Sequence, residues 1–90
     1  MSLQTLTASG FGEDWDGTYV YQYQKDKWKN GDYWIFRNSY YYMISSSEYL
    51  FFEEEHLKAR MALPMDNNAP IDDPTGNYNG VNGEPNGSVS

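Results

Sequence analysis

The sequence predicts an all-β fold, namely a small antiparallel meander, sandwich or barrel of four to five strands followed by an extended C-terminal arm. Residues 18–24 (TYVYQYQ) place a tyrosine at every second position, and this period of two is typical of a strand with one buried face. Asp-Gly and Asn-Gly pairs, which favour tight hairpin turns, separate the short aromatic runs. All four prolines lie from residue 64 onward, where large apolar residues are scarce.

Aromatic rings are the main source of buried surface in this chain of 90 residues. Fifteen of its 16 Trp, Tyr and Phe residues lie between positions 11 and 52, whereas Leu, Ile and Val together number 11. A domain of this size buries a modest fraction of its surface, so it needs large side chains to stabilise its fold. We therefore expect a core of rings on a small sheet.

The first part of the chain contains two expected strands and two expected connections. Residues 3–8 are β-prone and are predicted to form an edge strand. Residues 14–17 (DWDG) predict a turn, because Asp-Gly tolerates the positive φ angles of tight hairpins. Residues 18–24 then form the clearest strand, with tyrosines on one face and Val or Gln on the other. Residues 25–31 are predicted to be a polar connection that carries one Trp and ends in Asn-Gly.

Three further strands are expected in the middle of the chain, at the spacing of a meander. Residues 32–37 are apolar on both faces and are predicted to form a central strand. Residues 40–45 and 48–53 are predicted to be the next two strands. Residues 54–63 fit a short helix with an apolar stripe and fit an extended segment equally well, so both interpretations stay open.

The composition changes at residue 64, which divides the chain into an aromatic β domain (1–63) and a segment rich in Pro, Gly and Asn (64–90). The second segment has no Lys or Arg and few large apolar groups. Such a segment does not offset its ordering entropy alone. It is predicted to be disordered in isolation or to form an arm that lies across a neighbouring subunit.

A Gly-x-Tyr pattern occurs three times, at residues 17–19, 31–33 and 76–78, each at or near an expected turn. It is either a weak internal repeat or the ordinary tendency of Gly to end turns and of Tyr to begin strands. We favour the second interpretation.

The charge and composition exclude several classes of function. The chain has no cysteine, so it offers no disulfide and no thiolate ligand, and its single histidine (His56) does not make a zinc site alone. The net charge of −7 argues against a nucleic-acid partner. No apolar run approaches the roughly 20 residues that span a bilayer, so membrane insertion is not expected. Residues 1–6 lack the features of a secretory signal, which favours synthesis in a cytoplasm.

The candidate catalytic and metal-binding groups are better explained by other roles. Residues 53–56 (EEEH) point in different directions on any regular element, so they favour a solvated charged face. Asp14 and Asp16, like the pair at 72–73, lack the spaced ligand series of an EF-hand loop. The serines at 45–47 have no Gly-x-Ser-x-Gly elbow around them. We predict no catalytic residue, no cofactor and no metal, and therefore no enzyme.

The tryptophans raise the question of sugar binding. Rings with polar neighbours stack on saccharides, but rings also give large buried area in a core or at an interface. Core or subunit packing accounts for most of these aromatics. Trp15 and Trp28 are flanked by polar residues in expected connections, so these two are predicted to be exposed.

Five segments of the chain carry a resemblance to a known module. They are Asp14–Tyr19 (DWDGTY), Tyr33–Phe36 (YWIF), Tyr41–Ser45 (YYMIS), Pro74–Gly80 (PTGNYNG) and Pro85–Ser90 (PNGSVS). In this order they resemble a small β module of tail fibres and other structural proteins of phages, cyanobacterial phages especially. That module begins with a polar Gly-Thr-Tyr, continues with an aromatic strand and an x-Ile-Ser segment, and ends with Gly-x-Tyr and Pro before a closing valine.

The resemblance implies a non-enzymatic structural protein of a virion, assembled in the host cytoplasm. Its expected partners are other virion proteins and further copies of itself. The sequence departs from the module in two places. Met43 stands where a Trp often precedes Ile-Ser, and residues 53–56 have no counterpart in the pattern.

Two alternatives accompany the structural hypothesis. One is a module of a tail fibre that binds a host glycan or receptor, and the other is an acidic inhibitor that imitates nucleic acid. Lysines at 25, 27 and 29 interrupt the negative field that the inhibitor would need. For assembly or ligand contact we predict the following residues, which are exposed tryptophans or single apolar anchors: Trp15, Trp28, Ile71, Tyr78 and Val81.

Overall fold

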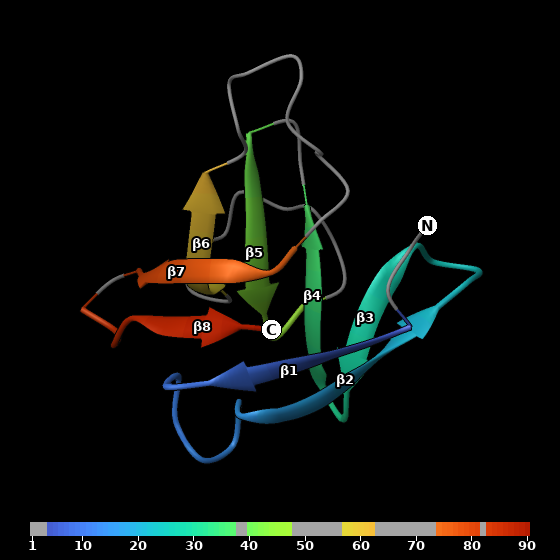
Figure 1. The fold of residues 1–90 in the computed structure, drawn as a ribbon, viewed down its shortest axis with the longest axis horizontal. Coiled ribbons are helices and arrows are strands. Elements are labelled where there is room, and N and C mark those ends of the chain that lie inside the picture. Colours follow the sequence, from blue (N-terminus) through green and yellow to red (C-terminus); the bar gives the residue numbers. More distant parts are fainter. Residues whose placement is uncertain (1–3, 38–39, 48–56, 63–73, 82) are drawn as a thin grey trace.

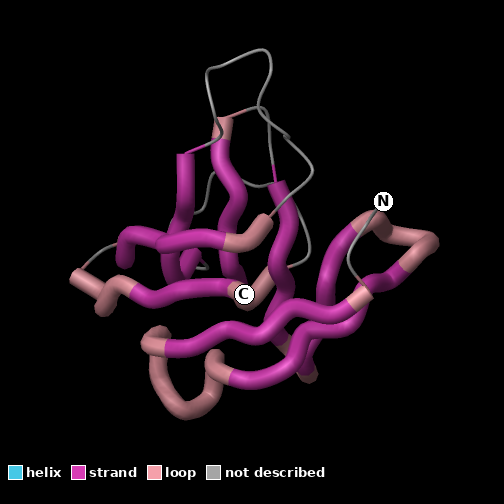
Figure 2. The backbone as a smooth tube through the Cα atoms, in the orientation of Figure 1, coloured by secondary structure: helices cyan, strands magenta, loops and turns pink. Residues whose placement is uncertain are grey.

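The chain forms a closed antiparallel barrel in the computed structural model (Figure 1), and its strands alternate between inward and outward side chains. The structure describes residues 4–37, 40–47, 57–62, 74–81 and 83–90. Its described residues are strands and loops (Figure 2). Each strand pairs with its neighbours in the chain. The strands are β1 (Thr5–Ser9), β2 (Gly17–Gln22), β3 (Lys27–Asn30), β4 (Tyr33–Arg37), β5 (Tyr41–Ser45), β6 (Leu57–Ala62), β7 (Gly76–Gly80) and β8 (Gly87–Val89).

The pairing of β1 with β8 closes the barrel. Ala8 lies opposite Val89, and the backbone amides of Thr7 and Ser90 donate to each other's carbonyl oxygens at 2.8 and 2.9 Å. Among the described strands, closure gives each strand a partner on both sides, which reduces the unpaired backbone groups that an open sheet presents. The prediction of an all-β antiparallel fold is confirmed, but the expected four to five strands are wrong because eight strands form the barrel.

The described part of the expected C-terminal arm, residues 74–81 and 83–90, supplies β7 and β8. The side chain of Tyr78 is 0% exposed and lies in the core, and Ala59 of β6 pairs with Gly80 of β7. These residues therefore belong to the barrel, which corrects the prediction of an arm for this part. Residues 64–73 lie outside the described residues.

Three other expectations change with the closed topology. The predicted edge strand at 3–8 becomes β1, which lies between β2 and β8. The predicted connection at 25–31 contains β3, and the open choice for residues 54–63 is settled as a strand over Leu57–Ala62. The strand predicted at 48–53 lies outside the described residues.

The strands expected at 18–24, 32–37 and 40–45 are confirmed as β2, β4 and β5. Asn30 pairs with Tyr33 around a two-residue turn, as the Asn-Gly signal predicted, and Gly31 adopts a φ of 62° there. In β2, Tyr19 points into the core while Val20 is 49% exposed, so the predicted alternation holds within Gly17–Gln22; Tyr23, which was expected on the same face as Tyr19, lies beyond the strand and is 74% exposed.

Buried side chains form one cluster inside the barrel and a second one against its wall. The inner cluster combines rings with small aliphatics: Leu6, Ala8, Phe11, Tyr19, Trp28, Ile35, Tyr42, Ile44, Ala59, Tyr78 and Val89. Since Ile35 faces inward, the alternation of β4 and β5 directs Trp34, Phe36 and Met43 of the second cluster outward. Lysine ammonium groups of the 25–29 segment lie 5.0 to 5.3 Å from the Trp34 and Phe36 ring centres, so cations cover these rings.

Two of the three Gly-x-Tyr segments have the same local structure. Gly17 and Gly76 have φ angles of 137° and 144°, a region that favours glycine. The tyrosine two residues later is buried, and its hydroxyl donates at 2.6 Å to the carbonyl oxygen four residues before it, Tyr19 to Trp15 and Tyr78 to Pro74. The third segment differs, because Tyr33 is only half-buried.

Candidate functional site

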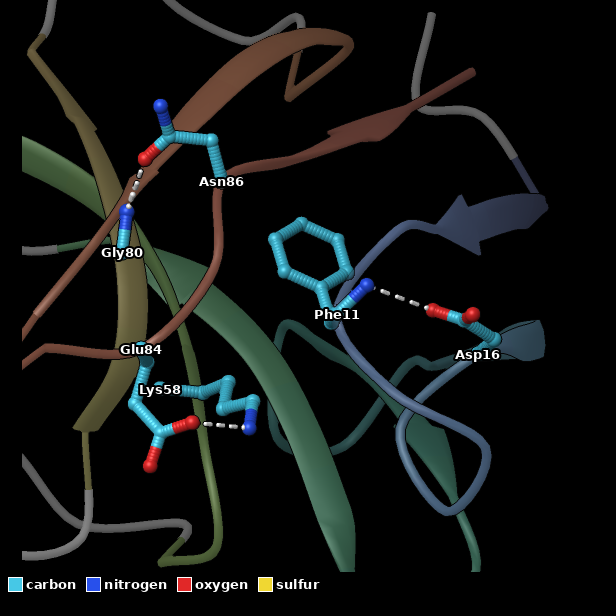
Figure 3. Close-up of polar contacts among 6 residues, drawn as sticks. All are labelled: Phe11, Asp16, Lys58, Gly80, Glu84 and Asn86. Carbon is cyan, nitrogen blue, oxygen red and sulfur yellow. Dashed lines mark hydrogen bonds and ion pairs between the residues drawn. The ribbon is translucent and has the colours of Figure 1, made fainter.

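The loops that join β1 to β2, β3 to β4 and β7 to β8 meet at one end of the barrel, which we call the Trp15 end. Asp16 shapes the first of these loops. Its carboxylate accepts a hydrogen bond from the backbone amide of Phe11 at 2.9 Å (Figure 3). It also accepts one from the backbone amide of Gly10 at 3.2 Å. The amides of Trp15 and Asp16 both donate to the Gly12 carbonyl oxygen. Asp16 therefore stabilises the turn, as the sequence analysis favoured.

Trp15 and Tyr33 form a stacked pair at this end. Their ring centres are 4.1 Å apart and their planes are inclined by 28°. The ammonium group of Lys58 lies 5.5 Å from the centre of the Trp15 ring and makes a 2.5 Å ion pair with Glu84 (Figure 3). Residues from three separate segments of the chain thus meet around one lysine.

A β-bulge places this lysine. Ile44 pairs with Ala59 and Ser45 with Leu57, so Lys58 is the extra residue on β6. A bulge re-aims the side chain of the extra residue and bends the strand. Here the Lys58 side chain is only 12% exposed, and its backbone carbonyl accepts the amide of Val81 at 3.1 Å. Lys58 therefore connects β6 both to the β1–β2 loop and to the β7–β8 loop.

The β7–β8 loop folds closely over the end of β7. The amide of Gly80 donates to the side-chain oxygen of Asn86 at 2.8 Å (Figure 3), and the Glu84 amide donates to the Val81 carbonyl at 3.2 Å. A Cβ atom on Gly80 would lie 1.7 Å from the Glu84 carbonyl oxygen. Only glycine allows the backbone to approach this closely.

Tyr19 is a buried titratable group at this end of the barrel. Burial, and then the charges of Asp16 and ionised Tyr33, raise the pKa of Tyr19 well above its usual value near 10, while a hydrogen bond from Asn30 lowers it. The hydroxyl therefore stays protonated near neutral pH. It acts as a fixed donor to the Trp15 carbonyl, which stabilises the loop that carries Trp15.

The predicted contact residues lie in different environments. Trp15 is half-buried in the stack with Tyr33, and Val81 is half-buried in the β7–β8 loop. Lys58 contacts both residues, Trp15 through its ammonium group and Val81 through its backbone carbonyl. Trp28 was expected to be exposed, but it lies in β3 and is 5% exposed, because the alternation of this strand turns its lysines outward and its Trp inward. Tyr78 is buried within its own chain, which corrects its assignment as an intersubunit anchor. Ile71 lies outside the described residues.

The closed topology places β7, β8, β1 and β2 side by side, and these four strands form a second candidate surface. The outward-facing side chains of β7, β8, β1 and β2 carry no charge, and we call this surface the uncharged wall. It is bordered by Lys29, which pairs with Val20, and by Arg60, which pairs with Asn79. Its members, which include Ser90 directly after β8, are Asn77, Asn79, Ser88, Ser90, Thr5, Thr7, Ser9, Thr18, Val20 and Gln22.

The residues of the uncharged wall come from both ends of the chain. Cross-strand pairs bring them into rows, for example Thr18 beside Thr7 and Ser9 beside Ser88, whose hydroxyl oxygens are 3.3 Å apart. The alternation of each strand indicated which side chains face outward. Their common surface depends on the β1–β8 pairing, which the sequence analysis did not predict.

Within the described ranges, no group of three or more His, Cys, Asp or Glu side chains is arranged to hold a metal ion. The part of the chain that the structure describes includes no helix of sufficient length and apolar character to cross a membrane.

A scan against models of protein families and searches of the curated proteins and of the solved structures found no match to this chain.

Proposed function

We propose that this chain is a non-enzymatic structural module of a phage virion, as a decoration, tail or fibre component. It acts by associating with further copies of itself and with other virion proteins. The observation that carries the proposal is the uncharged wall, a four-stranded face without ionised groups in a chain of net charge −7. The order of aromatic, turn and Pro-containing segments that resembles the phage module supports the same assignment.

The distribution of charge favours association through this wall. All the acidic residues that the structure describes lie in turns and loops between strands: Glu13, Asp14, Asp16, Asp26, Asp32 and Glu84. Copies of an acidic chain repel each other, and burying an unpaired carboxylate is costly. Contact through the uncharged wall buries hydroxyl, amide and methyl groups instead and leaves those carboxylates outside the contact.

The closed barrel also limits how subunits associate. An open sheet recruits a second chain by adding a strand to its edge, but β1 and β8 already pair with each other. Subunits must therefore contact each other through side-chain faces. The exposed methyl groups of Val20, Thr5 and Thr7, on β1 and β2, supply apolar area for such a contact, and the neighbouring strands supply hydroxyl and amide groups.

Light scattering of the full chain over a range of concentrations tests the proposal. We expect a concentration-dependent oligomer that is strengthened by salt, because salt screens the repulsion between acidic copies. Replacing Thr7 and Ser88 together by Glu places two like charges on the wall and should leave a folded monomer. The matched control is the double variant with Gln24→Glu and Ala62→Glu, which adds the same charge at exposed positions outside the wall. A wild-type chain that stays monomeric, or a wall variant that associates like the control, would overturn the proposal.

A further inference from the structure

The turn between β2 and β3 presents an aromatic ring to solvent. Tyr23 is 74% exposed, in contrast to the buried rings of the core. The turn is well defined, because Gln22 pairs with Lys27 and the amides of Lys25 and Asp26 both donate to the Gln22 carbonyl oxygen, at 3.1 and 2.8 Å. It projects at the right-hand edge of the barrel in Figure 1.

The exposed ring is held in place from two sides. It packs edge-on against Tyr21 at 5.0 Å between ring centres, and Tyr21 in turn contacts the buried Trp28 at 5.1 Å. The side-chain amide of Gln4 donates to the Tyr23 hydroxyl at 3.3 Å. A ring fixed in this way loses little conformational entropy when it binds a ligand.

The two charged residues of the turn are directed toward the barrel. The ammonium group of Lys25 lies 5.3 Å from the centre of the Trp34 ring, and the Asp26 carboxylate accepts a hydrogen bond from the Tyr21 hydroxyl. Asp26 adopts a φ of 54°, a left-handed conformation that Asp tolerates better than most residues. This conformation brings its carboxylate to Tyr21. At the tip of this turn, the exposed polar groups beside the Tyr23 ring are therefore the neutral amide side chains of Gln4 and Gln24.

We infer that this tip, formed by Tyr23 with Gln4 and Gln24, is a binding site for a neutral saccharide. A ring with a polar edge stacks on the apolar C–H face of a sugar, and side-chain amides both donate to and accept from vicinal hydroxyls. Because the charges of the turn already contact barrel residues, the site favours an uncharged sugar over an acidic one. The site is open and small, so binding is expected to be weak, with a Kd on the order of 1 mM.

The β2–β3 turn is a better candidate for glycan binding than the tryptophans that the sequence suggested. Trp28 is buried, and one face of Trp15 is already stacked on Tyr33. The tip lies apart from the outward rows of Ser, Thr and Asn side chains at the centre of the uncharged wall. Saccharide binding and self-association are therefore separable, and each can fail without the other.

The test is a titration of the isotope-labelled full chain with maltotriose, lactose and a mannose trisaccharide, followed by backbone amide NMR shifts. We expect shifts at residues 4 and 21–26 with at least one neutral sugar, and roughly tenfold weaker binding by Tyr23→Ala. Tyr40→Ala is the matched control, because Tyr40 is 73% exposed in a different turn and should bind like the wild type. Tyr23→Trp keeps a stacking ring and should retain binding.

Each of the following outcomes would overturn the inference. They are no shift with any of the three neutral sugars up to ~50 mM, shifts confined to other parts of the barrel, and equal weakening by Tyr23→Ala and Tyr40→Ala. A preference for sialyllactose over lactose would also overturn it, because an acidic sugar would then be the ligand. If Tyr23→Ala fails to fold, the position of the wild-type shifts and the Tyr23→Trp result decide the question.

Discussion

Replacing Tyr78 by Phe tests the hydrogen bond that ties the start of β7 to the preceding segment. The hydroxyl of Tyr78 donates to the Pro74 carbonyl oxygen at 2.6 Å, and both groups are buried. The substitution keeps the ring, so the packing of the inner cluster is retained. The polar change is that the buried Pro74 carbonyl group loses the hydrogen bond from the Tyr78 hydroxyl.

An unsatisfied buried acceptor costs about 1–3 kcal/mol, so we expect the free energy of unfolding of Tyr78→Phe to fall by that amount. For a domain of this length, each 1 kcal/mol lowers the Tm by about 4–8 °C. Tyr19→Phe removes the equivalent bond to the Trp15 carbonyl, which is only partly buried, and should cost about 1 kcal/mol because water can reach that carbonyl.

Urea unfolding followed by tryptophan fluorescence measures these differences, with the m-value as a check that the transition is unchanged. Tyr23→Phe is the matched control, because its exposed hydroxyl makes a 3.3 Å bond with Gln4 and its loss should change stability by less than about 0.5 kcal/mol. If Tyr78→Phe is as stable as Tyr23→Phe, the buried hydrogen bond does not stabilise the barrel and the reasoning is refuted.

Three further predictions concern the Trp15 end. Gly80→Ala should destabilise the chain by about 1–3 kcal/mol or more, because its Cβ would meet the Glu84 carbonyl group. In Gly31→Ala the new Cβ meets no atom, so this variant should lose only about 1 kcal/mol of stability, through its positive φ. Thermal unfolding of both variants measures the difference. A double-mutant cycle with Lys58→Met and Glu84→Gln should give a coupling of up to about 1 kcal/mol, since Glu84 is partly exposed; no coupling would show that the ion pair does not stabilise the loop. Above pH 10 the unfolded chain loses the Tyr19 proton while the folded chain keeps it, so stability should fall with rising pH by about 1.4 kcal/mol per pH unit from this group. Tyr19→Phe should remove that part of the slope in urea unfolding between pH 9 and 11, and an unchanged slope would contradict the assignment.

The strands with regular alternation could be predicted from the sequence, and those with interruptions could not. In β2 the tyrosines and their neighbours alternate between core and solvent, and in β4 apolar residues fill both faces because a second cluster covers the outside. In β3 the same alternation exists, but its outward lysines gave the segment the appearance of a loop. Their positions over the Trp34 and Phe36 rings explain why charged residues occur in this strand.

The last two strands were missed because their burial comes from close backbone approach. β7 (GNYNG) has one apolar side chain, Tyr78, and its terminal glycine lies against the backbone of the following loop. A composition of Gly and Asn predicts disorder when it is read without the neighbouring strands. In β6 the bulge at Lys58 interrupts the alternation, which explains why residues 54–63 fitted two interpretations.

The candidate sites could be predicted only in part, because the closed barrel brings their residues together from distant segments of the chain. Trp15 was identified, but its partners Tyr33, Lys58 and Glu84 come from three distant segments that the barrel brings together. The uncharged wall likewise combines the first and last described strands. Tyr23 was placed on the same strand face as the buried Tyr19, but β2 ends at Gln22, and Tyr23 therefore lies in the turn.

Removing residues 64–90 tests most directly whether the C-terminal segment closes the barrel. Circular dichroism and light scattering should be compared for the full chain and for a chain that ends at residue 63. We expect the full chain to unfold cooperatively and the shortened chain to show no cooperative transition, because it loses Tyr78 and Val89 from the core and leaves β1 and β6 with open edges. A shortened chain that stays folded, with a Tm close to that of the full chain, would contradict the closed barrel and would favour an arm that serves only to contact other subunits.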